Sequence, residues 1–252
     1  MVNERPLVFV DLDDTLFQTA RKMPEHSPRI AVTLDVQGQP NGFMTPVQQR
    51  LIDWLLASTD VVPVTARSIE AYQRVRLPFG QGAICAHGGV MLDADGSLDR
   101  DWHGQMRETL ADFQTRLSAL SEDILDFAER SGHPLRSWVV EEHGLRHYVV
   151  TKHSASDDAV LAKVLAEVRR RGLLHGMHVH ANGNNLAFLP QRLGKARAVE
   201  AWLRRDCRRH GERPVLGIGD SLSDLGFMSL CDLWATPSRS QLAKALEGVL
   251  DD

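Results

Sequence analysis

Short, wholly apolar runs rich in β-branched residues recur along the chain and predict buried strands. Leu7–Val10, Val61–Val64, Ala83–Ala86 and Val215–Ile218 are four such runs. Between them, apolar residues recur at three- and four-residue spacing, as in the segment that opens at Pro46, and this spacing is typical of helices. Buried strands that alternate with helices predict a parallel sheet wrapped by helices, an α/β fold with a Rossmann-like core.

The segment between the third and fourth strands has a different pattern. A turn-rich stretch, Asp93–Ser97, opens it, and Pro190 closes it. Apolar residues then alternate at steps of four and three from Met106 to Phe127, which predicts one long amphipathic helix packed on a sheet. Two hairpins and a second helix complete the order α-β-β-α-β-β. This order predicts an inserted α+β domain, with two helices on one face of a four-stranded antiparallel sheet.

Turn residues define the hairpins. Those of the insertion are Ser137–Glu141 with Arg146–Thr151, and Met177–His180 with Asn184–Leu189, the latter turned at Asn182-Gly183. A further hairpin over residues 30–45 follows the first strand, after a polar stretch that predicts a loop over 21–29. It is either a peripheral excursion or a flap over the strand ends. We expect a core domain of residues 1–90 and 188–252, and an inserted domain of residues 91–187.

Composition narrows the class of protein. The chain has 252 residues, of which 43% are hydrophobic and 25% charged, which excludes a disordered or fibrous protein. Its net charge of -4 gives no reason to expect nucleic acid as a partner. Three cysteines without CxxC spacing argue against a disulfide framework and favour a reducing compartment. Because no segment approaches the ~18 apolar residues of a membrane span, we expect a cytoplasmic protein with no membrane partner.

Polar side chains follow the predicted strands at the points where the strands end. Taken singly, each has an ordinary explanation, such as a helix cap or a solvated lysine. A parallel sheet would bring six of them to one edge: Asp11, Asp13, Thr65, Lys195, Asp220 and Asp224. Four carboxylates in one crevice repel one another unless a cation neutralises them, and hard oxygen ligands select Mg²⁺ over zinc. The sequence therefore predicts a magnesium site at this edge.

The spacing of these residues resembles the four motifs, in order, of the haloacid dehalogenase (HAD) superfamily of phosphohydrolases. The matching stretches are Asp11-Leu12-Asp13-Asp14-Thr15, Thr65, Lys195 and Gly219–Asp224. The insertion is similar to the type IIB cap of Cof-like proteins and of sucrose-phosphate, trehalose-phosphate and mannosyl-phosphoglycerate phosphatases. The sequence departs from the Cof-like pattern at Asp14, where those members usually have Gly.

The resemblance implies a two-step reaction with named roles. Asp11 would attack phosphorus and form an aspartyl phosphate, and Asp13 would protonate the leaving alkoxide and later accept a proton from water. Thr65 would hydrogen-bond a phosphoryl oxygen, and Lys195 would offset negative charge. The implied holders of Mg²⁺ are Asp11, the backbone carbonyl of Asp13, and Asp220, with Asp224 bracing the site.

Other polar residues are candidates for substrate contacts. Arg67 follows Thr65 by two residues and would reach the phosphate or the substrate, although a surface arginine is an equally good explanation. The hairpins of the insertion carry five more: Arg146, His147, His178, His180 and Asn184. His178 and His180 share a strand face, but two histidines without a third ligand favour polar strand positions over a metal site.

These features together predict a Mg²⁺-dependent phosphomonoester hydrolase. Its substrate would be a small phosphorylated metabolite, for which we expect a sugar or polyol phosphate, and the chain would be a monomer or a weak homodimer. A phosphomutase is one alternative, because it shares the aspartyl phosphate and differs in returning the phosphoryl group to a sugar. A receiver-like signalling domain is another, but its phospho-accepting aspartate would follow a middle strand, where this chain has Thr65.

Overall fold

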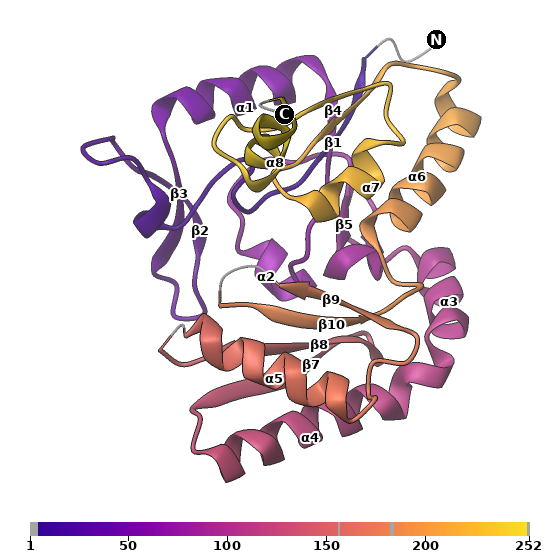
Figure 1. The fold of residues 1–252 in the computed structure, drawn as a ribbon. Coiled ribbons are helices and arrows are strands. Elements are labelled where there is room, and N and C mark those ends of the chain that lie inside the picture. Colours follow the sequence, from indigo (N-terminus) through magenta and orange to yellow (C-terminus); the bar gives the residue numbers. More distant parts are fainter. Residues whose placement is uncertain (1–4, 156, 182–183, 251–252) are drawn as a thin grey trace. The chain divides into compact units, whose positions relative to one another are not determined.

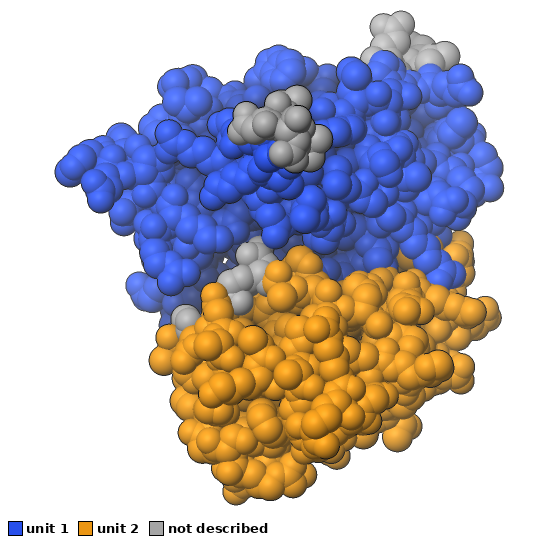
Figure 2. Space-filling view, in the orientation of Figure 1, with its two compact units in different colours: residues 1–100, 194–252 blue, residues 101–193 orange. Residues whose placement is uncertain are grey.

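The computed structural model describes residues 5–155, 157–181 and 184–250 of the chain. The chain divides into two compact units, which Figure 2 shows in different colours. Unit 1 comprises residues 1–100 and 194–252, and unit 2 comprises residues 101–193. In the described part of the chain, no helix has the length and apolar content that a membrane span requires.

Unit 1 is built on a four-stranded parallel sheet in the order β12-β11-β1-β4. Figure 1 labels β1 and β4 of this sheet. The strands have the bounds Leu7–Val10 (β1), Asp60–Pro63 (β4), Val215–Ile218 (β11) and Leu233–Ala235 (β12). All four residues of β1 are buried, as a strand between two neighbours requires. The predicted α/β fold with a parallel core is therefore confirmed. β12 is an exposed edge strand that the sequence analysis did not predict.

Helices separate these strands along the chain and follow the last of them. Their bounds are Pro46–Ser58 (α1), Ile69–Gln73 (α2), Lys195–His210 (α6), Leu225–Met228 (α7) and Gln241–Leu250 (α8). α1 begins where predicted, because Thr45 and Gln48 form a capping box and Pro46 occupies the first turn. Its buried residues Ile52 and Leu55 pack in one apolar cluster with residues of β1, which fixes the first strand beneath the helix.

The predicted third strand, β5 (Ala83–Cys85), is not a regular member of the parallel sheet. It pairs antiparallel with β6 (Val90–Leu92) and meets the sheet through an isolated parallel bridge between Val64 and Ile84. Thr65 N–H donates to the Ile84 carbonyl of β5 at 2.8 Å. Because the backbone N–H groups of a strand point alternately toward its two neighbours, the N–H of every second residue before Thr65 also faces β5. Pro63 is the next such residue and has no N–H to donate, which interrupts the ladder.

A second hairpin and three short 3-10 turns complete unit 1. β2 (Ile30–Leu34) and β3 (Pro40–Met44) form the predicted antiparallel hairpin. A 3-10 turn over Ala20–Lys22 overlaps the start of the loop predicted over residues 21–29. The other turns are η2 (Ala86–Gly88) and η4 (Leu222–Asp224).

Unit 2 has the predicted order of helices and strands. Its sheet has four antiparallel strands in the order β7-β8-β10-β9, with the bounds Leu135–Glu142, Leu145–His153, Leu186–Pro190 and Met177–Ala181. α4 (Gln114–Ser131) and α5 (Asp158–Arg170) share one apolar cluster with β8, β9 and β10, so both helices pack on the same face of this sheet (Figure 1). The predicted Asn182-Gly183 turn lies outside the described residues.

The long helix predicted from residue 106 to residue 127 is wrong. α3 (Arg100–Thr109) ends early, a 3-10 turn (Ala111–Phe113) follows, and α4 then begins. Met106, Leu110 and Leu117 are nevertheless all fully buried. Three residues of 3-10 helix make one turn and return the chain to the same face, so the apolar spacing continues across the break and does not reveal it.

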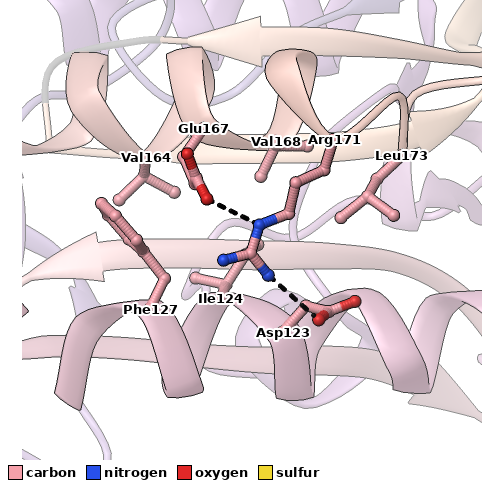
Figure 3. A pocket seen from close by; sticks show the side chains of 8 residues that line it. All are labelled: Asp123, Ile124, Phe127, Val164, Glu167, Val168, Arg171 and Leu173. Carbon is pink, nitrogen blue, oxygen red and sulfur yellow. Dashed lines mark hydrogen bonds and ion pairs between the residues drawn. The ribbon is translucent and has the colours of Figure 1, made fainter. Parts of the chain in front are cut away.

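A small cavity lies between α4 and α5 (Figure 3). Apolar residues such as Ile124 and Val164 line it, and Arg171 reaches across. The guanidinium of Arg171 is already bonded to Glu167 at 2.6 Å and to Asp123 at 3.3 Å. Because two carboxylates satisfy this one cation, the cavity offers no free positive charge to an anionic ligand.

Candidate active site

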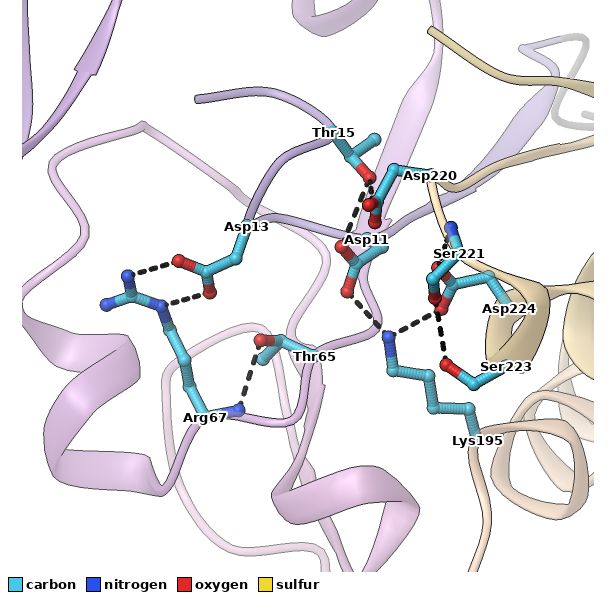
Figure 4. A network of polar contacts seen from close by, with 10 residues as sticks. All are labelled: Asp11, Asp13, Thr15, Thr65, Arg67, Lys195, Asp220, Ser221, Ser223 and Asp224. Carbon is cyan, nitrogen blue, oxygen red and sulfur yellow. Dashed lines mark hydrogen bonds and ion pairs between the residues drawn. The ribbon is translucent and has the colours of Figure 1, made fainter. Parts of the chain in front are cut away.

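The carboxyl ends of β1, β4 and β11 bring the predicted polar residues of unit 1 to one edge of the sheet (Figure 4). Asp11 directly follows β1, and its N–H donates to the Ile218 carbonyl of β11 at 2.8 Å. Thr65 follows β4, and Asp220 follows β11. Because the strands are parallel and in register, residues more than 200 positions apart in sequence meet in one place.

A buried ion-pair chain joins three of these residues. Lys195 Nζ donates to Asp11 Oδ1 at 2.6 Å and to Asp224 Oδ1 at 2.7 Å. The three side chains are at most 9% exposed. Lys195 is the first residue of α6, so the partial positive charge at that helix end adds to its own charge beside the two carboxylates.

Burial governs the ionisation of this group. Burial raises the pKa of Asp11 to about 7, against the attraction of Lys195. Burial and repulsion from Asp224 raise the pKa of Asp220 to about 6. Burial opposes the charge of Lys195, but Asp11 and Asp224 outweigh it and raise the pKa of that ammonium group. Burial also acts against ionisation of Asp224, yet Lys195 and Ser221 hold its pKa below the usual value.

Two hydroxyl residues that received no role in the sequence analysis also belong to this network. Thr15 Oγ1 lies 3.1 Å from Asp11 Oδ2 and 3.3 Å from Asp220 Oδ1. Ser221 donates to Asp224 Oδ2 from both its N–H, at 3.1 Å, and its hydroxyl, at 2.6 Å. A serine three residues before a carboxylate is the capping-box pattern, which is the sequence signal that could have identified Ser221.

The donor set fits a hard divalent cation. One carboxylate oxygen each from Asp11, Asp220 and Asp224 lies within 4.8 Å of the other two, and all three residues are buried. Both oxygens of Asp224 already accept hydrogen bonds from Lys195 and Ser221. Asp224 accepts three hydrogen bonds in this way, whereas Asp11 accepts one on each oxygen and Asp220 accepts one, from Thr15. Asp11 and Asp220 are therefore less saturated and better placed to hold Mg²⁺, and Asp224 is better placed to brace the lysine.

Asp13 lies outside this group. Its carboxylate is 54% exposed and accepts two hydrogen bonds from Arg67, both of 2.7 Å, on the side away from Lys195 (Figure 4). Thr65 is buried, and its hydroxyl oxygen accepts the N–H of Arg67 at 3.1 Å. The hydroxyl hydrogen of Thr65 therefore stays available for another acceptor.

The candidate substrate residues of unit 2 do not form one cluster of free side chains. Arg146 bonds Glu141 at 3.2 Å and the Gln114 carbonyl at 3.2 Å. The amide of Asn184 is bonded to the backbone N–H and carbonyl of His153, so it joins two chain segments. His178 is exposed and His180 half-buried on β9. Within residues 5–155, 157–181 and 184–250, no third metal-ligating residue joins these two histidines.

His147 has a different environment from the one the sequence suggests. It is fully buried, and among the described residues neither ring nitrogen has a hydrogen-bond partner. Burial, together with repulsion from His103, lowers the pKa of His147 to about 4. As placed here, the imidazole has no exposed surface to offer a substrate, which corrects the expected contact.

A hollow of about 750 Å³ lies in unit 1, near the start of β11 and not near Asp11. Arg213 lines it, and this cation is paired with Asp206 at 2.6 Å and with Asp60 at 2.5 Å. The hollow contains none of the predicted site residues.

Comparison with known proteins gives a consistent fold. No protein-family model matches the sequence, and no curated protein sequence matches it. The C-terminal domain of C. albicans trehalose-6-phosphate phosphatase has a TM-score of 0.59 and 16% identity, over 90% of this chain and 73% of that one. Sucrose-phosphatase from Synechocystis sp. PCC6803 has a TM-score of 0.53 and 16% identity, over 98% of each chain.

A trehalose-6-phosphate phosphatase related protein has a TM-score of 0.52 and 19% identity, over 98% of this chain and 100% of that one. At these identities the similarity establishes the fold and not the reaction. The chain therefore shares its fold with solved structures of trehalose-6-phosphate phosphatase and sucrose-phosphatase.

Proposed function

We propose that the protein is a Mg²⁺-dependent phosphomonoester hydrolase that works through an aspartyl phosphate on Asp11. The observation that carries this proposal is the buried cluster at the end of β1, where Asp11 meets Lys195, Thr15 and Asp220. A nucleophilic carboxylate needs ionisation, fixed orientation and nearby positive charge, and this cluster supplies the orientation and one cation.

The residues divide the reaction between them. In the first step, an Asp11 oxygen bonds to phosphorus while the bond from phosphorus to the leaving oxygen breaks, and Asp13 gives that oxygen its proton. In the second step, water bonds to phosphorus, its proton goes to Asp13, and the bond from Asp11 to phosphorus breaks. Lys195 offsets the charge on Asp11, and Thr65 donates its free hydroxyl hydrogen to a phosphoryl oxygen.

Mg²⁺ would be held by Asp11, Asp220 and the backbone carbonyl of Asp13. When bound, it would offset the charges of the carboxylates and of the phosphoryl group. Burial raises the pKa of both Asp11 and Asp220, which indicates that Lys195 alone does not neutralise the site. The chemistry of the donors and the shortage of positive charge both support a second cation.

A small sugar or polyol phosphate is the substrate class we propose. The support is that solved structures with this fold carry the names trehalose-6-phosphate phosphatase and sucrose-phosphatase, the latter determined with sucrose and phosphate. A phosphomutase would use the same residues and differ in the final acceptor. A cytoplasmic location and a monomeric or weakly dimeric state remain predictions, and the thiols of Cys85, Cys207 and Cys231 are compatible with the former.

The test is release of inorganic phosphate from a panel of phosphorylated metabolites with Mg²⁺, for wild type and Asp11→Asn. The amide is nearly isosteric but cannot attack phosphorus, so turnover should fall below about 1% of wild type while circular dichroism stays unchanged. Appearance of an isomeric sugar phosphate without free phosphate would indicate the mutase. Substantial hydrolysis by the variant would contradict the nucleophile assignment.

A further inference from the structure

We propose that Arg67 is a positioning residue for Asp13 and acts through that carboxylate, not through the phosphoryl group. The inference rests on the function proposed above, in which Asp13 is the acid and base. Its starting point is the bidentate pair in Figure 4: Nε donates to Asp13 Oδ2 and Nη2 to Asp13 Oδ1, both at 2.7 Å. A planar guanidinium fixes a carboxylate in distance and in orientation, which a single contact does not.

The guanidinium is itself anchored by its surroundings. Its third nitrogen, Nη1, donates to the Ala71 carbonyl of α2 at 3.1 Å. The guanidinium also lies over the ring of buried Phe17, 5.3 Å from the centroid. The side chain is 17% exposed. Arg67 is thus a fixed support, built from the turn after β4 and the start of α2.

The backbone of Arg67 is also held by hydrogen bonds. Its N–H donates to the Thr65 hydroxyl, and its carbonyl accepts the N–H of Ala86 at 2.7 Å. The segment that carries the guanidinium is therefore tied both to the candidate phosphate-binding residue and to the turn after β5. Movement of this segment would disturb the bond between Arg67 and Asp13.

Asp13 depends on this support because it lies near the surface. Its side chain is 54% exposed, and its carboxylate does not belong to the buried group of Asp11, Asp220 and Asp224. An acid and base must be held within hydrogen-bond distance of the reacting oxygen, and a solvated aspartate would sample several rotamers. Each guanidinium nitrogen already donates a hydrogen bond, which favours support of Asp13 over capture of phosphate.

A comparison of leaving groups separates the two roles. The value of kcat/KM reports the steps up to release of the alcohol. The sugar or polyol phosphate that wild type hydrolyses fastest releases a basic alkoxide, whereas p-nitrophenyl phosphate releases a stable phenolate that needs no proton. Both substrates carry the same phosphoryl group. A residue that acts through Asp13 therefore matters more for the first substrate, and a phosphate ligand matters equally for both.

For Arg67→Met we expect kcat/KM for the sugar or polyol phosphate to fall about 10- to 100-fold. This loss should exceed the loss for p-nitrophenyl phosphate by about tenfold or more. Arg67→Lys keeps the charge but not the planar pair of donors, so it should show the same imbalance, and it decides the question alone if the Met variant does not fold. Arg76→Met, at an exposed arginine of the same segment, is the matched control.

A double variant tests whether Arg67 acts through Asp13. In an Asp13→Asn background, Arg67→Met should cause little further loss with the sugar or polyol phosphate, because the carboxylate it positions is gone. Equal losses on both substrates, multiplying losses in the double variant, or full activity of Arg67→Lys would each overturn the inference and leave the phosphatase assignment standing. A wild type that hydrolyses neither substrate would refute both.

Discussion

At the scale of single residues, the feature that dominates the site is a lysine enclosed between two carboxylates. Lys195 is the cation that bonds both Asp11 and Asp224, and all three side chains are buried. Removing one member of a buried ion pair leaves an uncompensated charge, which costs far more than the loss of a surface pair. Lys195 thus stabilises the folded site and also offsets the charge of Asp11, the proposed nucleophile.

We therefore expect Lys195→Met to affect both stability and activity. Without metal at pH 8, the variant should lose about 3–5 kcal/mol of unfolding free energy, because Asp11 and Asp224 stay buried without their partner. Mg²⁺ should restore part of this loss, while phosphate release stays at least about 100-fold below wild type. Denaturant titrations with and without Mg²⁺ measure the first effect. Lys244→Met, at an exposed lysine of α8, is the control, and equal stability of both variants would contradict the prediction.

Asp220 gives a prediction about pH. Its pKa is raised from 3.8 to about 6 by burial and by Asp224, so between these values the folded state keeps a proton that the unfolded state releases. Stability from this group is therefore greatest below about pH 4 and is lost as the pH rises through 6. In metal-free protein, Asp220→Asn should be more stable than wild type at pH 7.5, on the order of 2 kcal/mol, and equal to it near pH 4.

Unfolding curves at both pH values, without metal, check the Asp220 prediction. Asp126→Asn, at an exposed aspartate of α4, should show the same difference from wild type at either pH. Adding Mg²⁺ at pH 7.5 should stabilise wild type more than Asp220→Asn, because the metal needs the ionised carboxylate. A difference between Asp220→Asn and wild type that does not vary with pH would refute the assignment.

At the scale of elements, the turn from β11 into η4 shows how backbone shape places a carboxylate. A Cβ at Gly219 would lie 2.6 Å from the Asp224 Cβ and 2.8 Å from the Met228 sulfur. No side chain fits in that space. A glycine at position 219 therefore allows Asp224 to lie within hydrogen-bond distance of Lys195. The geometry of the ion-pair chain therefore depends on a residue that has no side chain.

Gly219→Ala should consequently destabilise the protein by about 1–3 kcal/mol and lower phosphate release, since the added methyl displaces Asp224. Gly248→Ala is a matched control on α8, where a Cβ would meet nothing within 4 Å. There the same substitution should stabilise the helix by about 0.5–1 kcal/mol. Thermal unfolding of both variants gives the comparison, and similar effects of the two substitutions would refute the steric argument.

The sequence predicts elements well where burial decides them and poorly where hydrogen bonding or geometry does. β1 is a run of four buried residues and has the predicted bounds. β12 has three exposed residues and no pattern to detect. The break between α3 and α4 keeps the apolar spacing, so the pattern shows a single helix. Pro63 interrupts the pairing of β4 with β5 because the N–H that it lacks would face β5. The hydrophobic pattern of the sequence does not show which neighbouring strand the N–H of a residue faces.

The candidate site likewise contains some features that the sequence predicts and others that it does not. The convergence of Asp11, Lys195 and Asp220 follows from strand order, and strand order follows from the hydrophobic pattern. The bond between Arg67 and Asp13 joins positions 54 residues apart through side-chain geometry alone, so the sequence does not reveal it. The burial of His147 also depends on tertiary packing that alternation along a strand does not describe.

At the scale of the whole molecule, Asp11 and Asp220 of unit 1 and His147 of unit 2 respond to acid in opposite directions. The catalytic and metal-binding candidates, from Asp11 to Asp224, all belong to unit 1, and burial raises the pKa of Asp11 and of Asp220. Acidification toward pH 4 removes their unfavourable charge in metal-free protein. His147 belongs to unit 2, and burial lowers its pKa, so acidification forces a charge into that unit. Mild acid should therefore weaken unit 2 before unit 1.

His147→Leu isolates this effect. The pKa of His147 is lowered from 6.5 to about 4, so the unfolded state binds a proton between these values that the folded state excludes. Its contribution to stability is complete above pH 6.5 and is lost as the pH falls toward 4, about 2–3 kcal/mol in all. The leucine variant should lack this loss. At pH 7 it should be at least as stable as wild type, because neither ring nitrogen has a hydrogen-bond partner among the described residues.

Hydrogen exchange of β8 amides at pH 7 and at pH 4.5, corrected for the intrinsic exchange rates, measures the local effect of His147→Leu, and denaturant titration measures the global one. In wild type the free energy of opening at β8 should fall with acid more than that at β1, whereas in the variant the two should change in parallel. His175→Leu, at an exposed histidine of unit 2, should behave like wild type. If β8 loses the same protection in His147→Leu as in wild type, another group is responsible for the acid sensitivity of unit 2.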